Sequence, residues 1–68
     1  MYSNLIVEMV KAGYNKQELA KEIGIHYNTL RDKLSDSTEF KINEMVKIQK
    51  ILNEKNNTNN TIDYLFKK

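Results

Sequence analysis

Residues 15–34 read NKQELAKEIGIHYNTLRDKL, and this stretch decides the fold. Its apolar residues recur at helical spacing on both sides of Gly24, which predicts a helix over residues 16–23 and a second from about 27 to 34. Asn15 and Glu18 have the spacing of a capping box at the start of the first helix. Ala20 is small where the two helices would cross. The stretch therefore predicts a helix-turn-helix over about residues 16–34.

The two predicted helices divide into an inner and an outer side. Leu19, Ile23, Leu30 and Leu34 point inward, and Ile25 packs in the turn. The outer side of the second helix carries polar side chains, namely His26, Tyr27, Asn28, Thr29, Arg31, Asp32 and Lys33. Amide, guanidinium and hydroxyl groups on one helix face can bind base edges and phosphates in a major groove. An ordinary solvated helix face is the alternative for any one of them.

Three further helices are expected around this unit. The first runs from Ser3, as N-cap, to about residue 12, with Leu5, Ile6, Met9 and Val10 inward and Gly13 at its end. The next runs from about residue 44 to 53 after Asn43 as N-cap, and its inner stripe is Met45, Ile48 and Leu52, widened by Val46 and Ile51. Residues 53–60 are expected to be a solvated connector. Thr61 caps a short closing helix that contains Ile62, Leu65 and Phe66.

Composition limits the possible functions. The chain has 68 residues, no cysteine and one histidine. That length suits one domain, residues 1–68. The absence of cysteine excludes disulfides, and with a single histidine it also excludes clustered cysteine or histidine metal sites. No apolar run approaches the roughly 20 residues of a membrane helix, and no secretion signal is apparent, so a cytoplasmic location without membrane contact is expected.

Neither charge nor residue pattern suggests catalysis. The net charge is +2 and the isoelectric point about 8.9, which is only weakly basic for a nucleic-acid-binding protein. No nucleophile–base pair or phosphate loop is present, so we expect no enzyme activity, no cofactor and no small-molecule substrate.

Phe40 lies in the polar segment of residues 35–41 and is expected to close the core over the second helix of the helix-turn-helix.

These residues resemble the phage-repressor and Cro class of lambda-repressor-like, XRE-type helix-turn-helix proteins. The resemblance rests on ELAKEIGI (residues 18–25), the polar segment after it, STEF (37–40) and IDYLF (62–66). It implies a compact all-α bundle of five helices and a small Cro-like prophage regulator. Such a protein is expected to bind near-palindromic double-stranded DNA as a homodimer, with the helix of residues 27–34 in the major groove.

The resemblance and the side-chain chemistry together give a set of candidate DNA contacts. Base contacts are expected from Tyr27, Asn28, Arg31 and Asp32. Phosphate contacts are expected from Lys16, Gln17, His26, Thr29, Lys33, Thr38 and Lys41. Asp32 either accepts from a cytosine amino group or holds Arg31 or a neighbouring lysine.

Two alternatives stay open at this level. Asp32, Asp36 and Glu39 lie near the expected DNA face, and they favour a protein-interaction module on the same scaffold, such as an antirepressor or an antitoxin-like partner. Tyr64 and Phe66 either form a dimer interface or belong to the core.

Overall fold

The computed structural model describes all 68 residues, and every regular element in it is a helix. The helices are α1 (Ser3–Lys11), α2 (Lys16–Ile23), α3 (Tyr27–Leu34), α4 (Ile42–Asn56) and α5 (Ile62–Leu65). The prediction of an all-α bundle of five helices is therefore confirmed. None of the five combines the length and the apolar character needed to cross a membrane.

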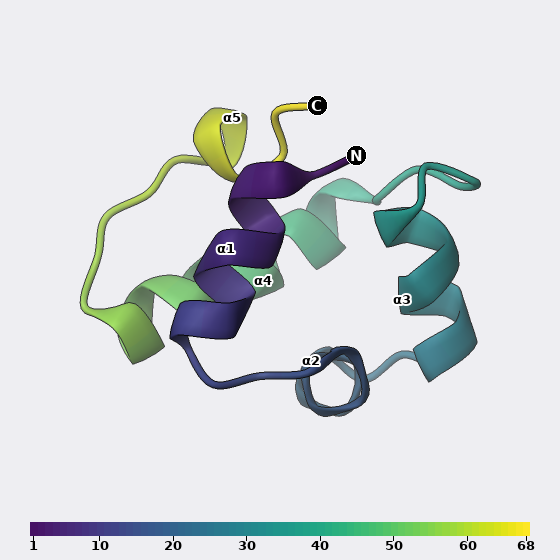
Figure 1. Cartoon of the computed structure of the whole chain (residues 1–68), viewed down its shortest axis with the longest axis horizontal. Coiled ribbons are helices and arrows are strands. Elements are labelled where there is room, and N and C mark those ends of the chain that lie inside the picture. Colours follow the sequence, from purple (N-terminus) through teal and green to yellow (C-terminus); the bar gives the residue numbers. More distant parts are fainter.

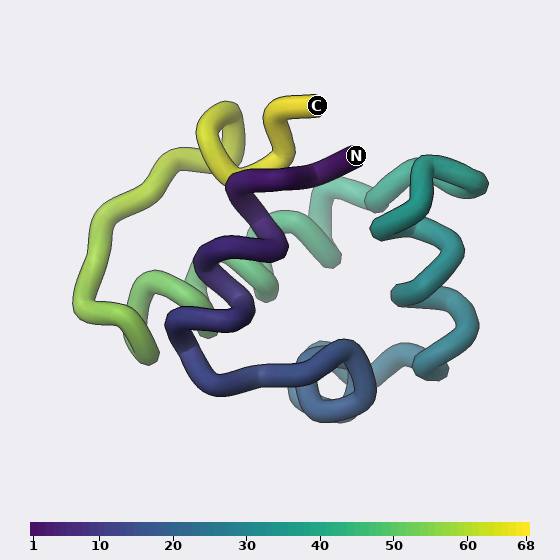
Figure 2. The backbone as a smooth tube through the Cα atoms, viewed as in Figure 1, coloured from purple at the N-terminus to yellow at the C-terminus, as the bar shows by residue number.

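The helices surround one apolar core. In Figure 1, α1 crosses in front of α4, with α2 and α3 towards one end of the molecule and α5 at the other. Figure 2 shows that the two chain ends lie close together, near the turn that follows α3. The fully buried large side chains come from all five helices: Leu5, Leu19, Leu30, Ile48, Leu52 and Leu65.

The helix-turn-helix forms as its sequence predicts. Asn15 Oδ1 accepts from the Glu18 N–H at 2.8 Å, and Glu18 Oε1 accepts from the Asn15 N–H at 3.0 Å, which completes the capping box. Gly24 ends α2 with φ +77°, a left-handed conformation that a glycine adopts without steric cost. Ala20 is buried between the helices. The predicted bounds of the two helices, the cap at Asn15, the turn at Gly24 and the inward-facing residues are all confirmed.

The start of α1 differs from the prediction. The helix begins at Ser3 itself, and Tyr2 is the N-cap without a side-chain hydrogen bond, so the assignment of Ser3 as N-cap is wrong. The physical reason is that the Tyr2 ring is buried, which fixes the backbone without a cap. Val10 is 65% exposed and does not join the core as predicted. Gly13 follows the helix with φ +79°, as expected of a terminating glycine.

Three aromatic rings join segments that lie far apart in the chain. The centroids of Tyr2 and Phe40 lie 5.3 Å apart, those of Tyr2 and Phe66 6.0 Å, and those of Phe40 and Phe66 5.0 Å. All three pairs meet edge to face, the favourable arrangement for aromatic quadrupoles. Phe40 is buried in the core as predicted, and its ring partners come from the two terminal segments.

Helix α4 is longer than predicted at both ends. It starts at Ile42, so Asn43 lies inside the first turn and is not its N-cap. The Lys41 N–H donates instead to Glu44 Oε1 at 2.8 Å. Val46 is 47% exposed, because the core-facing stripe of α4 is narrower than the sequence suggested.

Residues 53–60 are not the simple solvated connector that we predicted. Residues 53–56 extend α4, and Asn53 organises the chain that follows. Asn53 Oδ1 accepts from the Asn60 N–H at 3.0 Å and the Thr58 hydroxyl at 2.9 Å, while Asn53 Nδ2 donates to the Asn60 carbonyl at 2.9 Å. Asn56 Nδ2 donates to the Glu8 carbonyl of α1 at 2.9 Å. Thr61 caps α5 as predicted by accepting from the Tyr64 N–H.

A buried ion pair connects α3 to α4. Lys33 Nζ donates to Glu44 Oε1, and Lys33 is only 6% exposed. Burial raises the pKa of the Glu44 carboxyl, but hydrogen bonds from Lys33 and from the Lys41 N–H outweigh it. The pKa therefore lies below its usual range, which means that folding stabilises the ionised carboxylate.

Loss of the Asn15 cap should destabilise the fold. We expect Asn15→Ala to lower the free energy of unfolding by about 1 kcal/mol, because the Glu18 N–H loses its acceptor. Asn43→Ala is the matched control and should change it by less than about 0.5 kcal/mol, since Asn43 is exposed and caps nothing. Urea unfolding of both variants measures the difference. Equal losses would contradict the assigned caps.

Acid should weaken the fold partly through Glu44. Its pKa is lower in the folded than in the unfolded chain, so the unfolded chain binds more protons as the pH falls through the acidic range. The stabilisation is present above the unfolded pKa and is lost as the pH falls through the folded one. In Glu44→Gln the free energy of unfolding should fall less between pH 6 and pH 3 than in the wild type. An unchanged pH dependence in this variant would contradict the assignment.

Candidate nucleic-acid interface

Helix α3 lies at one edge of the molecule, so one of its sides is free (Figure 1). Its inner side is anchored by Leu30 and Leu34, which are buried. Along its outer side, Asn28, Thr29 and Arg31 are exposed, and Tyr27 is 39% exposed. An exposed polar side on a helix with an anchored apolar side is what a groove-binding helix requires.

The four predicted base-contact residues share one face of α3. Tyr27, Asn28, Arg31 and Asp32 follow the spacing i, i+1, i+4 and i+5, which places them side by side on a helix. Arg31 Nη2 donates to Asp32 Oδ1 at 3.4 Å. Asp32 therefore holds Arg31, which is one of the two roles that we expected for Asp32. This ion pair is half exposed, which leaves the other guanidinium N–H groups free to donate elsewhere.

The first turn of α2 opens beside this face. A hollow of about 290 Å³ is lined by Asn15, Lys16, Gln17 and Tyr27. The first N–H groups of a helix lack intrahelical acceptors, and the helix dipole makes this end positive. Because Asn15 already accepts the Glu18 N–H, the amides of Lys16 and Gln17 remain for an outside acceptor. The hollow therefore lies between Lys16 and Gln17, the predicted phosphate contacts of α2, and Tyr27 of α3.

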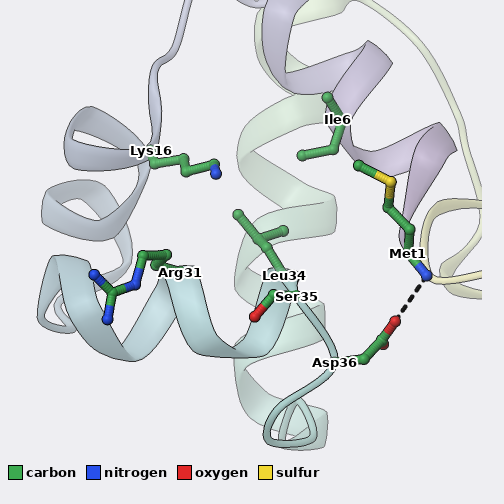
Figure 3. A pocket seen from close by; sticks show the side chains of 7 residues that line it. All are labelled: Met1, Ile6, Lys16, Arg31, Leu34, Ser35 and Asp36. Carbon is green, nitrogen blue, oxygen red and sulfur yellow. Dashed lines mark hydrogen bonds and ion pairs between the residues drawn. The ribbon is translucent and has the colours of Figure 1, made fainter.

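A second hollow of about 320 Å³ lies between α1, α2 and α3, as Figure 3 shows. Ile6 and Leu34 provide apolar walls, and Lys16 points inward from the first turn of α2. Lys16 lines both hollows, so its ammonium group lies where α2 and α3 meet. Arg31 borders this hollow on the α3 side.

The turn after α3 is firmly built. The Asp32 carbonyl accepts from the Ser37 N–H at 2.9 Å and from the Ser35 hydroxyl at 3.1 Å. Asp36 has φ +67° and accepts from the Met1 ammonium at 2.7 Å, drawn in Figure 3. Lys68 Nζ lies 3.2 Å from the same carboxylate. The turn is thus attached to α3 and to both ends of the chain.

These two cations also determine the ionisation of Asp36. The hydrogen bond from the Met1 ammonium and that from Lys68 hold the pKa of the Asp36 carboxyl below its usual range. The hydrogen bond to Asp36 in turn raises the pKa of Lys68. The sequence analysis missed these contacts, because the two partners of Asp36 lie 35 and 32 residues away from it and no local pattern marks them.

The structure corrects one predicted phosphate contact. We expected Lys33 on the outer side of α3, but its side chain is buried and its ammonium group faces Glu44. The helical repeat puts Lys33 on the side opposite Tyr27 and Arg31, towards α4. The remaining predicted phosphate contacts are accessible. Gln17, His26, Thr29, Thr38 and Lys41 are exposed, and Lys16 is half-buried.

Two other candidate positions can now be placed. His26 is the N-cap of α3 with an extended backbone, and its side chain makes no capping hydrogen bond. Phe66 packs against Tyr2 and Phe40 and therefore belongs to the core, which was the alternative reading for this residue. Tyr64 is exposed on α5.

Comparison with known proteins agrees with this geometry. The family model described as "Bacterial regulatory protein, Fis family" matches residues 6–36, from α1 to the turn after α3. This is a little under half of the chain, and it contains the whole helix-turn-helix. No curated protein and no solved structure matched significantly. The match supports a helix-turn-helix DNA-binding regulator, and the helix-turn-helix geometry of α2 and α3 agrees with it.

Proposed function

We propose that this protein is a small Cro-like regulator that binds double-stranded DNA sequence-specifically, with α3 in the major groove. The observation that carries the proposal is the single exposed face of Tyr27, Asn28, Arg31 and Asp32 on an otherwise anchored helix. Asn28 suits the bidentate donor and acceptor pattern of adenine, and Arg31 suits guanine. Asp32 orients Arg31 and accepts from a cytosine amino group.

Phosphate contacts on both sides of α3 would fix its depth and orientation in the groove. On one side we assign them to Lys16 and Gln17 at the positive end of α2, with His26 and Thr29 beside them. On the other side we assign them to Thr38 and Lys41 after the turn. Lys33 is excluded from this set, because Glu44 already binds its ammonium group.

A homodimer on a near-palindromic operator is the second part of the proposal. Two copies would read half-sites about one helical turn, roughly 34 Å, apart. The longest extent of the molecule is 28 Å, so neighbouring copies on such a site would lie close to each other. Tyr64 is the candidate contact on α5, since its side chain is exposed whereas Phe66 is partly buried and packs into the aromatic cluster.

The charge distribution favours DNA over a protein partner for this face. The alternative of an antirepressor or antitoxin-like module rested on Asp32, Asp36 and Glu39. Asp32 is paired with Arg31, and Asp36 is paired with the Met1 ammonium and Lys68. These pairs reduce the repulsion that Asp32 and Asp36 would exert on phosphates, whereas Glu39 is exposed and makes no ion pair.

Selection from randomised duplexes tests the proposal directly. The full chain should enrich one near-palindromic motif, and sedimentation with and without that duplex should show two copies per site. Failure to enrich any motif, together with tight binding to a protein partner, would favour the interaction module instead.

Substitution of Asn28 should relax the preference at one base pair. We expect Asn28→Ala to cost about 1–3 kcal/mol on the selected duplex, and to bind variants of that base pair with nearly equal affinity. Competition binding with all single-base-pair variants measures both effects. Asn59→Ala is the matched control, because Asn59 is exposed in the connection between α4 and α5. Undiminished preference at every position in Asn28→Ala would contradict the base contact.

Substitution of Lys16 should act on all sequences alike. Loss of one phosphate contact lowers the slope of log affinity against log salt concentration by about 0.9. Lys16→Ala should therefore weaken selected and random duplexes by similar factors and flatten the salt dependence. Lys50→Ala, an exposed lysine on α4, should leave both unchanged. A sequence-selective loss in Lys16→Ala would argue against a phosphate contact.

A further inference from the structure

Helix α3 is supported unequally on its two sides. α2 packs closely along it, whereas the α4 backbone approaches α3 less closely. The apolar contacts of Leu30 and Leu34 hold α3 to the core, but side chains of this kind tolerate small rotations and shifts. On the α4 side, the directional contact is the hydrogen bond from Lys33 to Glu44.

One oxygen atom of Glu44 connects the end of α3 to the start of α4. Glu44 Oε1 accepts from Lys33 Nζ in the last turn of α3 and from the Lys41 N–H at the start of α4. The connection therefore spans the turn of residues 35–40. The side chain of Lys33 is 7% exposed and that of Glu44 13%, so water competes little for either group.

The position of Lys33 on the helix gives this connection its effect. At 100° per residue, Lys33 lies on the side of α3 opposite the centre of the base-contact face. The link thus holds α3 from behind, while Asn28 and Arg31 face outward. The same carboxylate holds the N–H of Lys41, one of the proposed phosphate contacts.

We infer that Lys33 and Glu44 form a positioning pair that determines sequence discrimination without touching DNA. The pair fixes the orientation of α3 relative to Thr38 and Lys41, so that base contacts and phosphate contacts form at the same time. This inference rests on the proposed function of α3. A buried ion pair adds little net stability compared with an apolar pair, but it accepts a narrow range of geometries.

The decisive variant is Lys33→Met/Glu44→Gln. Methionine fills the space of the lysine stem, and glutamine keeps an oxygen that can accept from the Lys41 N–H, so both charges leave together and no buried charge is stranded. Glu44→Gln alone is a second variant that can keep both hydrogen bonds. Lys50→Met is the matched control on the exposed side of α4. Thermal unfolding of each variant establishes the temperature at which all of them are folded.

The readouts at that temperature are the affinity ratio between selected and random duplexes and the salt slope of binding. We expect the double variant to lose about tenfold in this ratio, the discrimination carried by about one base pair, and to keep the wild-type salt slope. Glu44→Gln should lose less, and Lys50→Met should match the wild type. A purely structural pair would change stability and leave the ratio intact in the folded protein.

Two results would overturn the inference and leave the proposed function standing. One is an unchanged ratio in the folded double variant. The other is a salt slope smaller by about 0.9, which would make Lys33 a phosphate contact after all. If the wild-type chain itself shows no preference for any duplex, the proposed function fails and the inference fails with it.

Discussion

The close packing of α2 on α3 is the constraint on which the structure depends. Each of these helices has eight residues, which is too short to be stable alone in water. They persist because Leu19 and Leu30 are fully buried between them and the rest of the core, and because buried Ala20 lets the helices approach. The free side of α3 exists only as a result of this anchoring.

Local signals explain why so much of this unit was predictable from the sequence. A capping box needs two residues three positions apart, and a left-handed terminus needs one glycine, so Asn15, Glu18 and Gly24 could be interpreted without tertiary information. The spacing of Leu30 and Leu34 likewise identified the inner side of α3. These features specify where the helices begin, end and face, which is most of what a helix-turn-helix consists of.

The failures share one physical cause, namely dependence on a distant partner. Lys33 looks like any surface lysine until Glu44 is brought beside it, and Asp36 looks like an unpaired acid until both chain ends reach it. Val10 and Val46 have the right spacing for a core, but the bundle has no helix to cover them. Most candidate contacts on the DNA face are exposed as predicted, whereas Lys16 and Asp32 are half-buried and Lys33 is buried against Glu44.

The amide of Asn53 has a consequence for the chemical ageing of the protein. This side chain accepts two hydrogen bonds through its oxygen and donates one through its nitrogen to the Asn60 carbonyl. Hydrolysis of the amide would replace that donor by a carboxylate oxygen, which would then face another oxygen without a shared proton. The connection between α4 and α5 would lose one of the hydrogen bonds that hold it to α4. A single slow deamidation, far from α3, would therefore weaken the attachment of this connection to α4, although Gln49 still donates to the Asn60 carbonyl.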